Sequence, residues 1–259
     1  MPKRILTVLM CLFITLGATL IFIGGSTRQA MAFFGVGEEP FDELLMKIWA
    51  HNFYTDFVRT TIQGKDKEVT KGLIARDGQD VRVDTDSRAA EKTDDEMAEI
   101  MLWTGMIMLP EQKKSIMLFH IPKKFMIMRP EESEKYAPEK MSKSKERGER
   151  YVPPKVEKIK IGEEKHDNHP CDVYKIIVTW PDGKKREGKG WQAQDLEIKP
   201  WLKFEVYYPE DEPDRTEKIE LYNLKIGRPA RSWFSPPPAY TEIKDFMELY
   251  KGMMGDMGM

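Results

Sequence analysis

The stretch IMLWTGMIML, residues 100–109, is apolar at both its odd and its even positions. Alternate residues of a strand face opposite sides, so Met108 is expected on one side of this predicted strand and Trp103 on the other. The turn PEQKK at residues 110–114 leads into a second apolar run, SIMLFHI, at residues 115–121. An antiparallel strand normally exposes one face to water. Both faces of the predicted hairpin must therefore be covered by helices, a second layer, a ligand or a partner.

Period-two patterns continue on both sides of this hairpin and predict a mainly β fold. Strands are expected at residues 56–63, 69–75, 81–83, 125–128, 156–161, 173–180, 190–194, 201–208 and 218–226. In the last of these, Leu224 falls out of phase with Ile219 and Leu221, which predicts a β-bulge near Tyr222-Asn223. Apolar spacing also predicts short amphipathic helices at residues 40–49 and 243–250.

Length and composition define the class of protein. The chain has 259 residues, of which 41% are hydrophobic and 32% charged. These values exclude disorder throughout and a polytopic membrane protein. The net charge of -2 and the pI of about 6.2 provide no basic field, so nucleic acid is not an expected partner.

The N-terminus predicts export. Lys3 and Arg4 precede an uncharged apolar run at residues 5–23, and Ala30-Met31-Ala32 supplies the small residues of a signal-peptidase site. Residues 1–32 are therefore predicted to be a signal peptide. An uncleaved anchor is the alternative, because 19 helical residues span about 28 Å, close to the thickness of a bilayer core. The expected location is the periplasm, with attachment to the inner membrane if residues 5–23 are retained.

The rest of the chain, residues 33–259, is expected to form one domain. A charged stretch at about 129–158 mixes both signs with few apolar residues, which predicts a mobile insertion. A lid over a cavity is the alternative interpretation of this insertion. The Gly/Met tail from residue 252 is expected to fray. Only Cys171 follows the predicted signal, so no intramolecular disulfide is expected.

Several stretches resemble the LolA/LolB-like periplasmic lipoprotein-sorting superfamily, in particular its uncharacterised bacterial branch, known as a domain of unknown function. They are WAHNFYTDFVRTTIQG from Trp49, MLPEQKKSIML from Met108, GEEKHDNHPCDVYKIIV from Gly162, GWQAQDLEIKPWLKF from Gly190 and LYNLKIGRPARSWFSPPPAY from Leu221. The resemblance implies an α+β fold in which a strongly curved antiparallel sheet forms an open half barrel, with helices across its concave side. It also implies an apolar cavity that carries acyl chains. The charged insertion departs from the compact pattern of the family.

Catalytic templates are absent from the sequence. It contains no Gly-x-Ser-x-Gly elbow, His-Glu-x-x-His helix or glycine-rich nucleotide loop, so neither an enzyme nor a cofactor is expected. His166, His169 and Cys171 have a spacing that offers two imidazoles and a thiolate to a metal. An ordinary turn at Asp167-Asn168 followed by a strand is the competing interpretation, so no metal site is assigned.

The main hypothesis is a non-enzymatic binding protein that holds an acyl chain or another apolar ligand by desolvation in the half-barrel groove. Outer-membrane lipoprotein or lipid handling would be its setting. The candidate lining residues are Trp103, Met106, Met108, Met117, Phe119, Phe204 and Tyr208. One alternative is a cell-envelope interaction module whose apolar face is covered by a protein partner. A second is metal binding through the two histidines and the cysteine.

Overall fold

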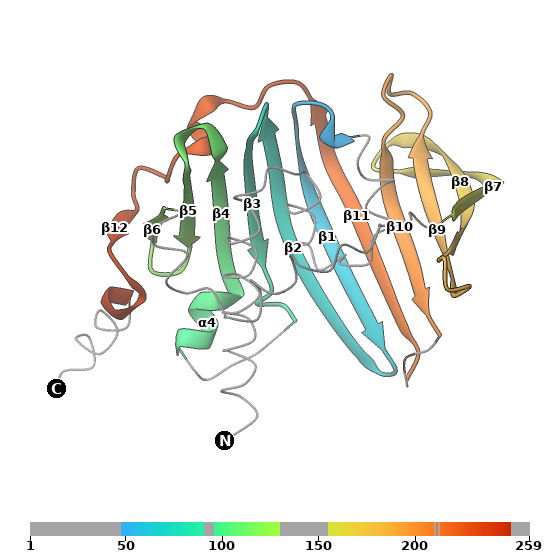
Figure 1. The fold of residues 1–259 in the computed structure, drawn as a ribbon, viewed down its shortest axis with the longest axis horizontal. Helices are drawn as coiled ribbons and strands as arrows, with labels where there is room; N and C mark the ends of the chain where they lie inside the picture. Colours follow the sequence, from blue (N-terminus) through green and yellow to red (C-terminus); the bar gives the residue numbers. More distant parts are fainter. Residues whose placement is uncertain (1–47, 91–95, 130–154, 210, 212, 250–259) are drawn as a thin grey trace.

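A computed structural model describes residues 48–90, 96–129, 155–209, 211 and 213–249. Within them, twelve strands form one sheet in the order β12-β6-β5-β4-β3-β2-β1-β11-β10-β9-β8-β7. The strands pair antiparallel except β12, which pairs parallel with β6. Figure 1 shows this sheet as a single row of strands. The predicted signal at residues 1–32, most of the predicted insertion and the predicted tail lie outside the described residues.

The N-terminal half of the sheet is an antiparallel meander. Its elements are β1 (Phe53–Gln63), β2 (Asp66–Asp77), β3 (Asp80–Asp86), α4 (Glu96–Leu102), β4 (Trp103–Leu109), β5 (Lys114–Phe119) and β6 (Lys124–Met128). Gly64 and Gly78 have φ of 60° and 62°, a left-handed conformation that glycine adopts without steric cost, and they turn β1 into β2 and β2 into β3. The strand expected from residue 100 begins only at Trp103, because residues 100–102 end the helix α4.

The C-terminal half adds a second meander and returns to the first. Its elements are β7 (Lys155–His166), β8 (His169–Thr179), β9 (Lys185–Ala193), β10 (Trp201–Tyr208), β11 (Arg215–Ile226), the 3₁₀ turn η5 (Arg231–Phe234) and β12 (Thr241–Ile243). β11 pairs with β1 and joins the two halves. The predicted bulge is confirmed, because Asn223 and Leu224 of β11 lie between the pairs Asp56↔Tyr222 and Tyr54↔Lys225. The helix expected from residue 243 is displaced, since Ile243 ends β12 and the described helical residues are 246–249.

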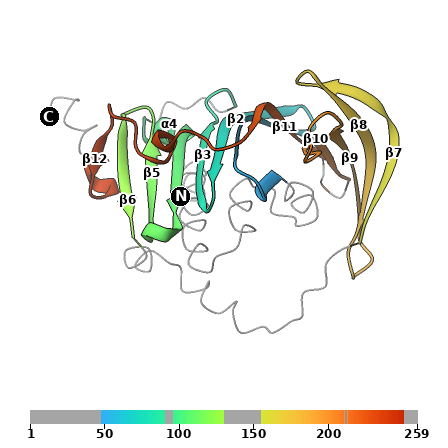
Figure 2. The ribbon, with the colours of Figure 1, turned by 90° about the horizontal axis from the view of Figure 1, so that it is seen from above.

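The sheet curves strongly, and the helical turn at Ile48 and Trp49 (blue) lies inside the curve (Figure 2). These two residues belong to a cluster on the concave face, whose members come from strands β1 to β6 and β11, from β12 and from helical residues. They are Ile48, Trp49, Phe53, Phe57, Ile74, Val81, Val83, Ile100, Met106, Met108, Met117, Phe119, Met126, Leu221, Ile243 and Leu249. The expectation of helices on the concave side is met here by a few short ones.

The convex face of the same half carries a second cluster. It consists of Ala75, Ile107, Leu109, Ile116, Leu118 and Phe234, with Tyr54, Phe125, Ile127, Trp233 and Tyr240 packed against it. Residues 227–240 run from β11 toward β12 and cross this face. They supply Trp233, Phe234 and Tyr240 to the cluster. The hairpin β4–β5 is therefore covered on both faces by other parts of the same chain. This cover explains why both of its faces are apolar.

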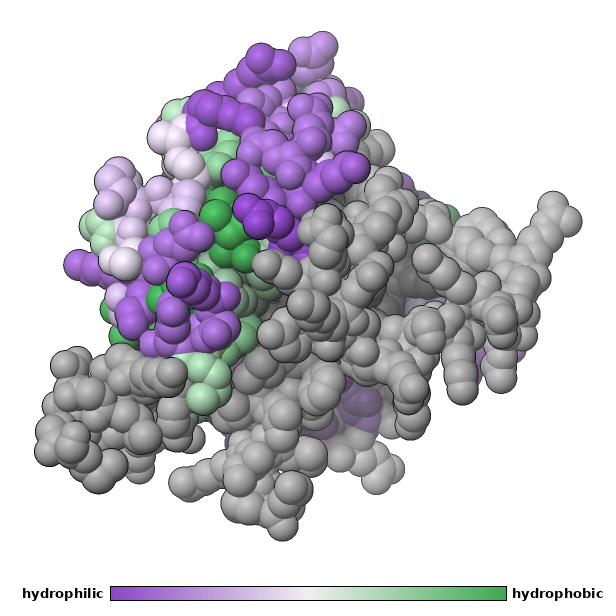
Figure 3. Space-filling model, turned by 60° about the vertical axis from the view of Figure 1, so that its left-hand side comes forward, coloured by the Kyte–Doolittle hydropathy of each residue, from purple (hydrophilic) through white to green (hydrophobic). Residues whose placement is uncertain are grey.

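The two edges of the sheet differ. β12 is three residues long, whereas β7 is twelve residues long and most of its side chains are exposed. On the side of the molecule that carries the β12 and β6 edge, a hydrophobic area (green) is bordered by hydrophilic residues (purple) (Figure 3). Among the described residues, none of the helices has both the length and the apolar character that a membrane crossing requires.

Candidate functional site

The structure separates the seven candidate lining residues into three groups. Met106, Met108, Met117 and Phe119 lie together on the concave face, and each is at most 5% exposed. Register explains their contact, because Met106 is directly opposite Met117 in the pair β4–β5. Helical residues pack over these side chains, so this part of the concave face is filled by the protein itself.

Trp103 lies on the opposite, convex face. Its indole stacks on the imidazole of His120 with ring centroids 5.0 Å apart, and the guanidinium of Arg88 lies 4.0 Å from its ring centroid. The alternation of β4 places Trp103 and Met106 on different faces, so these two residues do not line one space.

Phe204 and Tyr208 lie on the concave face, but in the other half of the sheet. Phe204 is opposite Ile219 in the pair β10–β11, and Leu221 on the same face of β11 is opposite Phe57. Phe204 and Tyr208 belong to a cluster that is separate from the one on β4 and β5, and we call it the concave floor. Its members are Ile176, Val178, Trp201, Phe204, Val206 and Tyr208. Val156, Tyr174, Trp180 and Ile219 pack against it.

A glycine in β9 allows the concave floor to pack closely. Gly190 lies opposite Phe204 on one side and Tyr174 on the other. A Cβ atom at this position would lie 2.7 Å from both Ile176 Cδ1 and Trp201 Cζ3. The absence of a side chain thus lets the Trp201 ring lie across β9.

One end of the concave floor is polar. The carboxylate of Glu217 is only 5% exposed and accepts hydrogen bonds from Arg59 Nη2 at 2.6 Å and from the Tyr208 hydroxyl at 3.2 Å. The guanidinium groups of Arg186 and Arg215 lie 4.2 and 4.1 Å from the Tyr208 ring centroid. We call these five residues the Glu217 cluster. Burial, followed by the Glu217 charge, raises the pKa of Tyr208 to about 12.

Charge is unevenly distributed in this cluster. It combines three guanidinium groups with one carboxylate, and Asp211 offsets a further charge by pairing with Arg215 at 3.1 Å. Arg59 and Arg215 are thus each paired with a carboxylate, and Arg186 lies on the Tyr208 ring beside an apolar surface. Such an arrangement suits an amphiphile, because its apolar body is desolvated while an anionic or hydrogen-bonding head meets cationic donors.

The sequence analysis missed Arg59, Arg186, Arg215 and Glu217. The signal was present for two of them, because Arg59 shares the parity of Phe57 and Glu217 shares the parity of Ile219 and Leu221. Charged residues in phase with buried apolar positions indicate an internal polar site. That Arg59 and Glu217 meet depends on the pairing of β1 with β11, which links residues 158 positions apart.

The His166, His169 and Cys171 side chains form no metal-binding geometry. His166 Nε2 lies 2.8 Å from the Leu221 carbonyl oxygen, and His169 Nδ1 lies 3.0 Å from Asp195 Oδ2. Within the described ranges, no three His, Cys, Asp or Glu residues are grouped so that they could hold a metal ion. Cys171 is fully buried, and burial raises its pKa to about 11.

Comparison with known proteins gives structural similarities only. No family model and no curated protein matches the chain. An uncharacterized conserved protein from Thermus thermophilus is similar with a TM-score of 0.41 and 8% identity, over 80% of this chain and 100% of that one. MucB of Pseudomonas aeruginosa, in its complex with MucA, is similar with a TM-score of 0.39 and 11% identity, over 77% of this chain.

The chain spans 60% of the matched MucB chain. A LolA superfamily protein from Nitrosomonas europaea is similar with a TM-score of 0.29 and 8% identity, over 75% of this chain and 96% of that one. A member of the superfamily that the sequence resembles is therefore among the solved structures to which this chain is similar.

Proposed function

We propose that this chain is a non-enzymatic binding protein that holds an acyl chain or a comparable apolar ligand against the concave floor. The observation that carries the proposal is the origin of the side chains there. All the hydrophobic residues of the floor cluster come from strands of one sheet, except Trp180 in the turn after β8. Within the described part of the chain, the floor cluster contains no helical residue, whereas the cluster on the concave face of β4 and β5 does. The six core side chains of the floor are each at most 5% exposed, so a ligand reaches them only if the packing over them opens.

The Glu217 cluster supplies the polar contacts of the proposed site. Arg59 is held by Glu217, and the guanidinium groups of Arg186 and Arg215 each lie against the Tyr208 ring. A few such groups beside a mostly apolar surface are typical of small-molecule sites, where they orient the ligand. In this proposal they meet the head of the amphiphile and take part in no covalent step.

The proposed setting follows from the sequence. Export through residues 1–32 would place the protein in the periplasm, free or anchored through residues 5–23, where lipids and lipoprotein acyl chains are potential ligands. Handling of outer-membrane lipoproteins or lipids is the proposed role.

Ligand uptake tests the proposal directly. The region from residue 33 is purified, extracted with organic solvent and analysed for lipid by mass spectrometry, and displacement of a fluorescent fatty acid is then titrated. Val206→Phe adds volume on the floor and is expected to weaken uptake about tenfold or more. Ile177→Phe, which changes a half-buried residue on the other face of β8, is the matched control. Absence of both lipid and uptake in a folded protein would overturn the proposal.

A second candidate function, an interaction module for a cell-envelope protein, is favoured by β7, the outermost strand of the sheet among the described residues. Ile159 and Ile161 of β7 are 50% and 51% exposed, and β7 is the outermost strand. A partner strand could extend the sheet there, although the many charged residues of β7 oppose unspecific pairing. A photocrosslinker at residue 161 should then capture one defined protein, whereas one at Ile62, which is 42% exposed on an interior strand, should not.

A further inference from the structure

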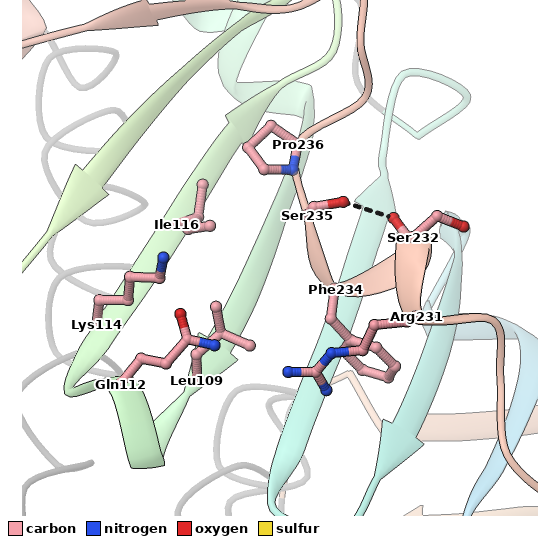
Figure 4. A pocket seen from close by; sticks show the side chains of 9 residues that line it. All are labelled: Leu109, Gln112, Lys114, Ile116, Arg231, Ser232, Phe234, Ser235 and Pro236. Atoms are coloured by element: carbon pink, nitrogen blue, oxygen red, sulfur yellow. Dashed lines mark hydrogen bonds between the residues drawn. The ribbon is translucent and has the colours of Figure 1, made fainter.

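A separate cavity lies on the convex face, between the tip of the β4–β5 hairpin and η5 (Figure 4). Its volume is about 350 Å³. We call it the hairpin pocket. Its apolar wall is formed by Leu109, Ile116 and Phe234, and its polar side chains include Gln112, Lys114 and Arg231. Since the concave floor is on the other face of the sheet and in its other half, the pocket is independent of the proposed function.

The apolar wall is preformed. Leu109 and Ile116 are each 2% exposed and Phe234 is 4% exposed, and all three belong to the convex cluster. Their positions are fixed by packing that exists without a ligand, so the wall needs no ordering when a ligand enters, although little of its own surface remains to be buried.

The polar groups come from two separate segments. Figure 4 shows Gln112 and Lys114 extending from the hairpin, and Arg231 extending from η5, toward the space between them. Arg231 pairs with Asp80 through Nη1, which leaves further guanidinium N–H groups for another acceptor. Lys114 has no carboxylate partner within the described residues and is half-buried. The pocket therefore presents donors without matching acceptors.

The charge of the pocket selects the kind of anion. Lys114 and Arg231 contribute two positive charges and Asp80 one negative charge, so one positive charge is unbalanced. A monoanion neutralises it, whereas a phosphate dianion would add repulsion against Asp80, whose side chain is 11% exposed. A carboxylate also matches the planar donor geometry of a guanidinium.

We propose that the hairpin pocket binds a carboxylate carried on a short apolar body. The carboxylate lies between Lys114 and Arg231, the Gln112 amide donates to it, and the apolar body packs on Phe234. A volume of about 350 Å³ is at the lower end of the range of small-molecule sites, about 300–1,000 Å³. The ligand is accordingly a small carboxylic acid or the C-terminal residue or two of a polypeptide.

Titration of the full chain with four probes tests this assignment. The probes are octanoate, an acetylated tripeptide ending in leucine with a free carboxylate, the same tripeptide as its C-terminal amide, and inorganic phosphate. Binding is followed by amide chemical shifts, which locate each probe. We expect the carboxylate probes to shift Lys114, Ser232 and Phe234 while leaving Val206, on the concave floor, unchanged.

Variants test the role of the charge. Lys114→Gln is expected to weaken carboxylate binding at least tenfold, and Lys114→Arg to restore most of it. Lys113→Gln, which removes the neighbouring exposed charge outside the pocket wall, is expected to leave binding unchanged. The two variants at residue 114 keep the test valid if either one folds poorly.

Each outcome has a defined meaning. Shifts at the pocket with octanoate alone support the site and assign a small acid, and shifts with the free tripeptide alone assign a polypeptide C-terminus. Equal binding of the amide or of phosphate overturns the carboxylate assignment. No shift at the pocket with either carboxylate, or no effect of Lys114→Gln, overturns the site. Uptake of fatty acid at the concave floor is scored separately at Val206.

Discussion

The imidazole Nδ1 atom of His120 lies 2.8 Å from the hydroxyl oxygen of Tyr240, in a hydrogen bond between residues 120 positions apart. His120 directly follows β5, and Tyr240 directly precedes β12. Arg82 of β3 makes a second connection to the same segment, donating from Nη1 to the Trp233 carbonyl oxygen at 3.1 Å. These two hydrogen bonds fix residues 227–240 on the convex face, where Phe234 and Trp233 cover the apolar hairpin.

Removal of the Tyr240 hydroxyl should loosen this segment. Tyr240→Phe leaves the His120 Nδ1 atom without its partner on a buried imidazole, so we expect a loss of about 1 kcal/mol in the free energy of unfolding, measured with urea. Tryptic cleavage after Arg231 should become faster. Tyr207→Phe is the control, because its hydroxyl bonds Glu205 of the same strand and holds no distant segment. Unchanged cleavage in Tyr240→Phe would show that the segment is fixed by packing alone.

Asp84 should make stability depend on pH in the acid range. Burial alone raises the pKa of Asp84, but its interactions with His120 and Arg82 outweigh burial, and the pKa lies below its usual value. The stabilisation is therefore complete above the unfolded-state pKa, about 3.9, and is lost as pH falls through the lower folded-state value. The Asp84–Arg82 pair is 9% and 12% exposed, so Asp84→Asn should cost about 3 kcal/mol at pH 7.

The difference in the free energy of unfolding between Asp84→Asn and the wild type should become smaller below about pH 4, because a protonated aspartate, like asparagine, carries no charge. Urea unfolding at a series of pH values measures it. The surface pair Asp86–Arg88, with side chains 31% and 42% exposed, provides the control Asp86→Asn, for which about 0–1 kcal/mol is expected. A stability difference between Asp84→Asn and the wild type that stays constant from pH 7 to pH 2 would contradict the assignment of the pH dependence to Asp84.

Gly105 should not tolerate a side chain. A Cβ atom at this position would lie 2.2 Å from Asp84 Oδ1 and 3.0 Å from His120 Nε2. Gly105→Ala is therefore expected to destabilise the fold by about 1–3 kcal/mol, through displacement of the buried carboxylate. Gly162→Ala is a matched control in β7, since nothing lies within 4 Å of the added Cβ atom. Thermal unfolding measures the stability of both variants. Equal stability of Gly105→Ala and Gly162→Ala would mean that Asp84 can move without cost.

Cys171 should be chemically inert in the folded protein. Its side chain is 0% exposed, and burial raises its pKa to about 11, so the thiolate that reacts with disulfide reagents is scarce at pH 7. In a Cys11→Ser background, we expect no labelling by Ellman's reagent within an hour at pH 7 and complete labelling in 6 M guanidinium. Rapid labelling without denaturant would contradict this expectation and show that Cys171 is a reactive thiol.

The candidate site was predicted only in part. Alternation within β10 correctly places Phe204 and Tyr208 on one face, because the period of a strand is a local property. Alternation within β4 likewise places Trp103 and Met106 on different faces. It does not reveal that the Met106 side is filled by helical residues, nor that Glu217 meets Arg59, since both facts depend on which distant segments lie next to each other.

The sequence by itself did not indicate the start of β4 at Trp103 or the short strand β12. It did indicate most of the other strands, the β-bulge near Tyr222-Asn223 and the need for cover on both faces of the hairpin. Each of these follows from side-chain period or from the backbone freedom of single residues. Only the tertiary structure decided what provides that cover and where donors converge on the hairpin pocket. Lys114 and Arg231 belong to segments that nothing local connects, and they meet because burying Phe234 against Leu109 and Ile116 brings η5 onto the sheet.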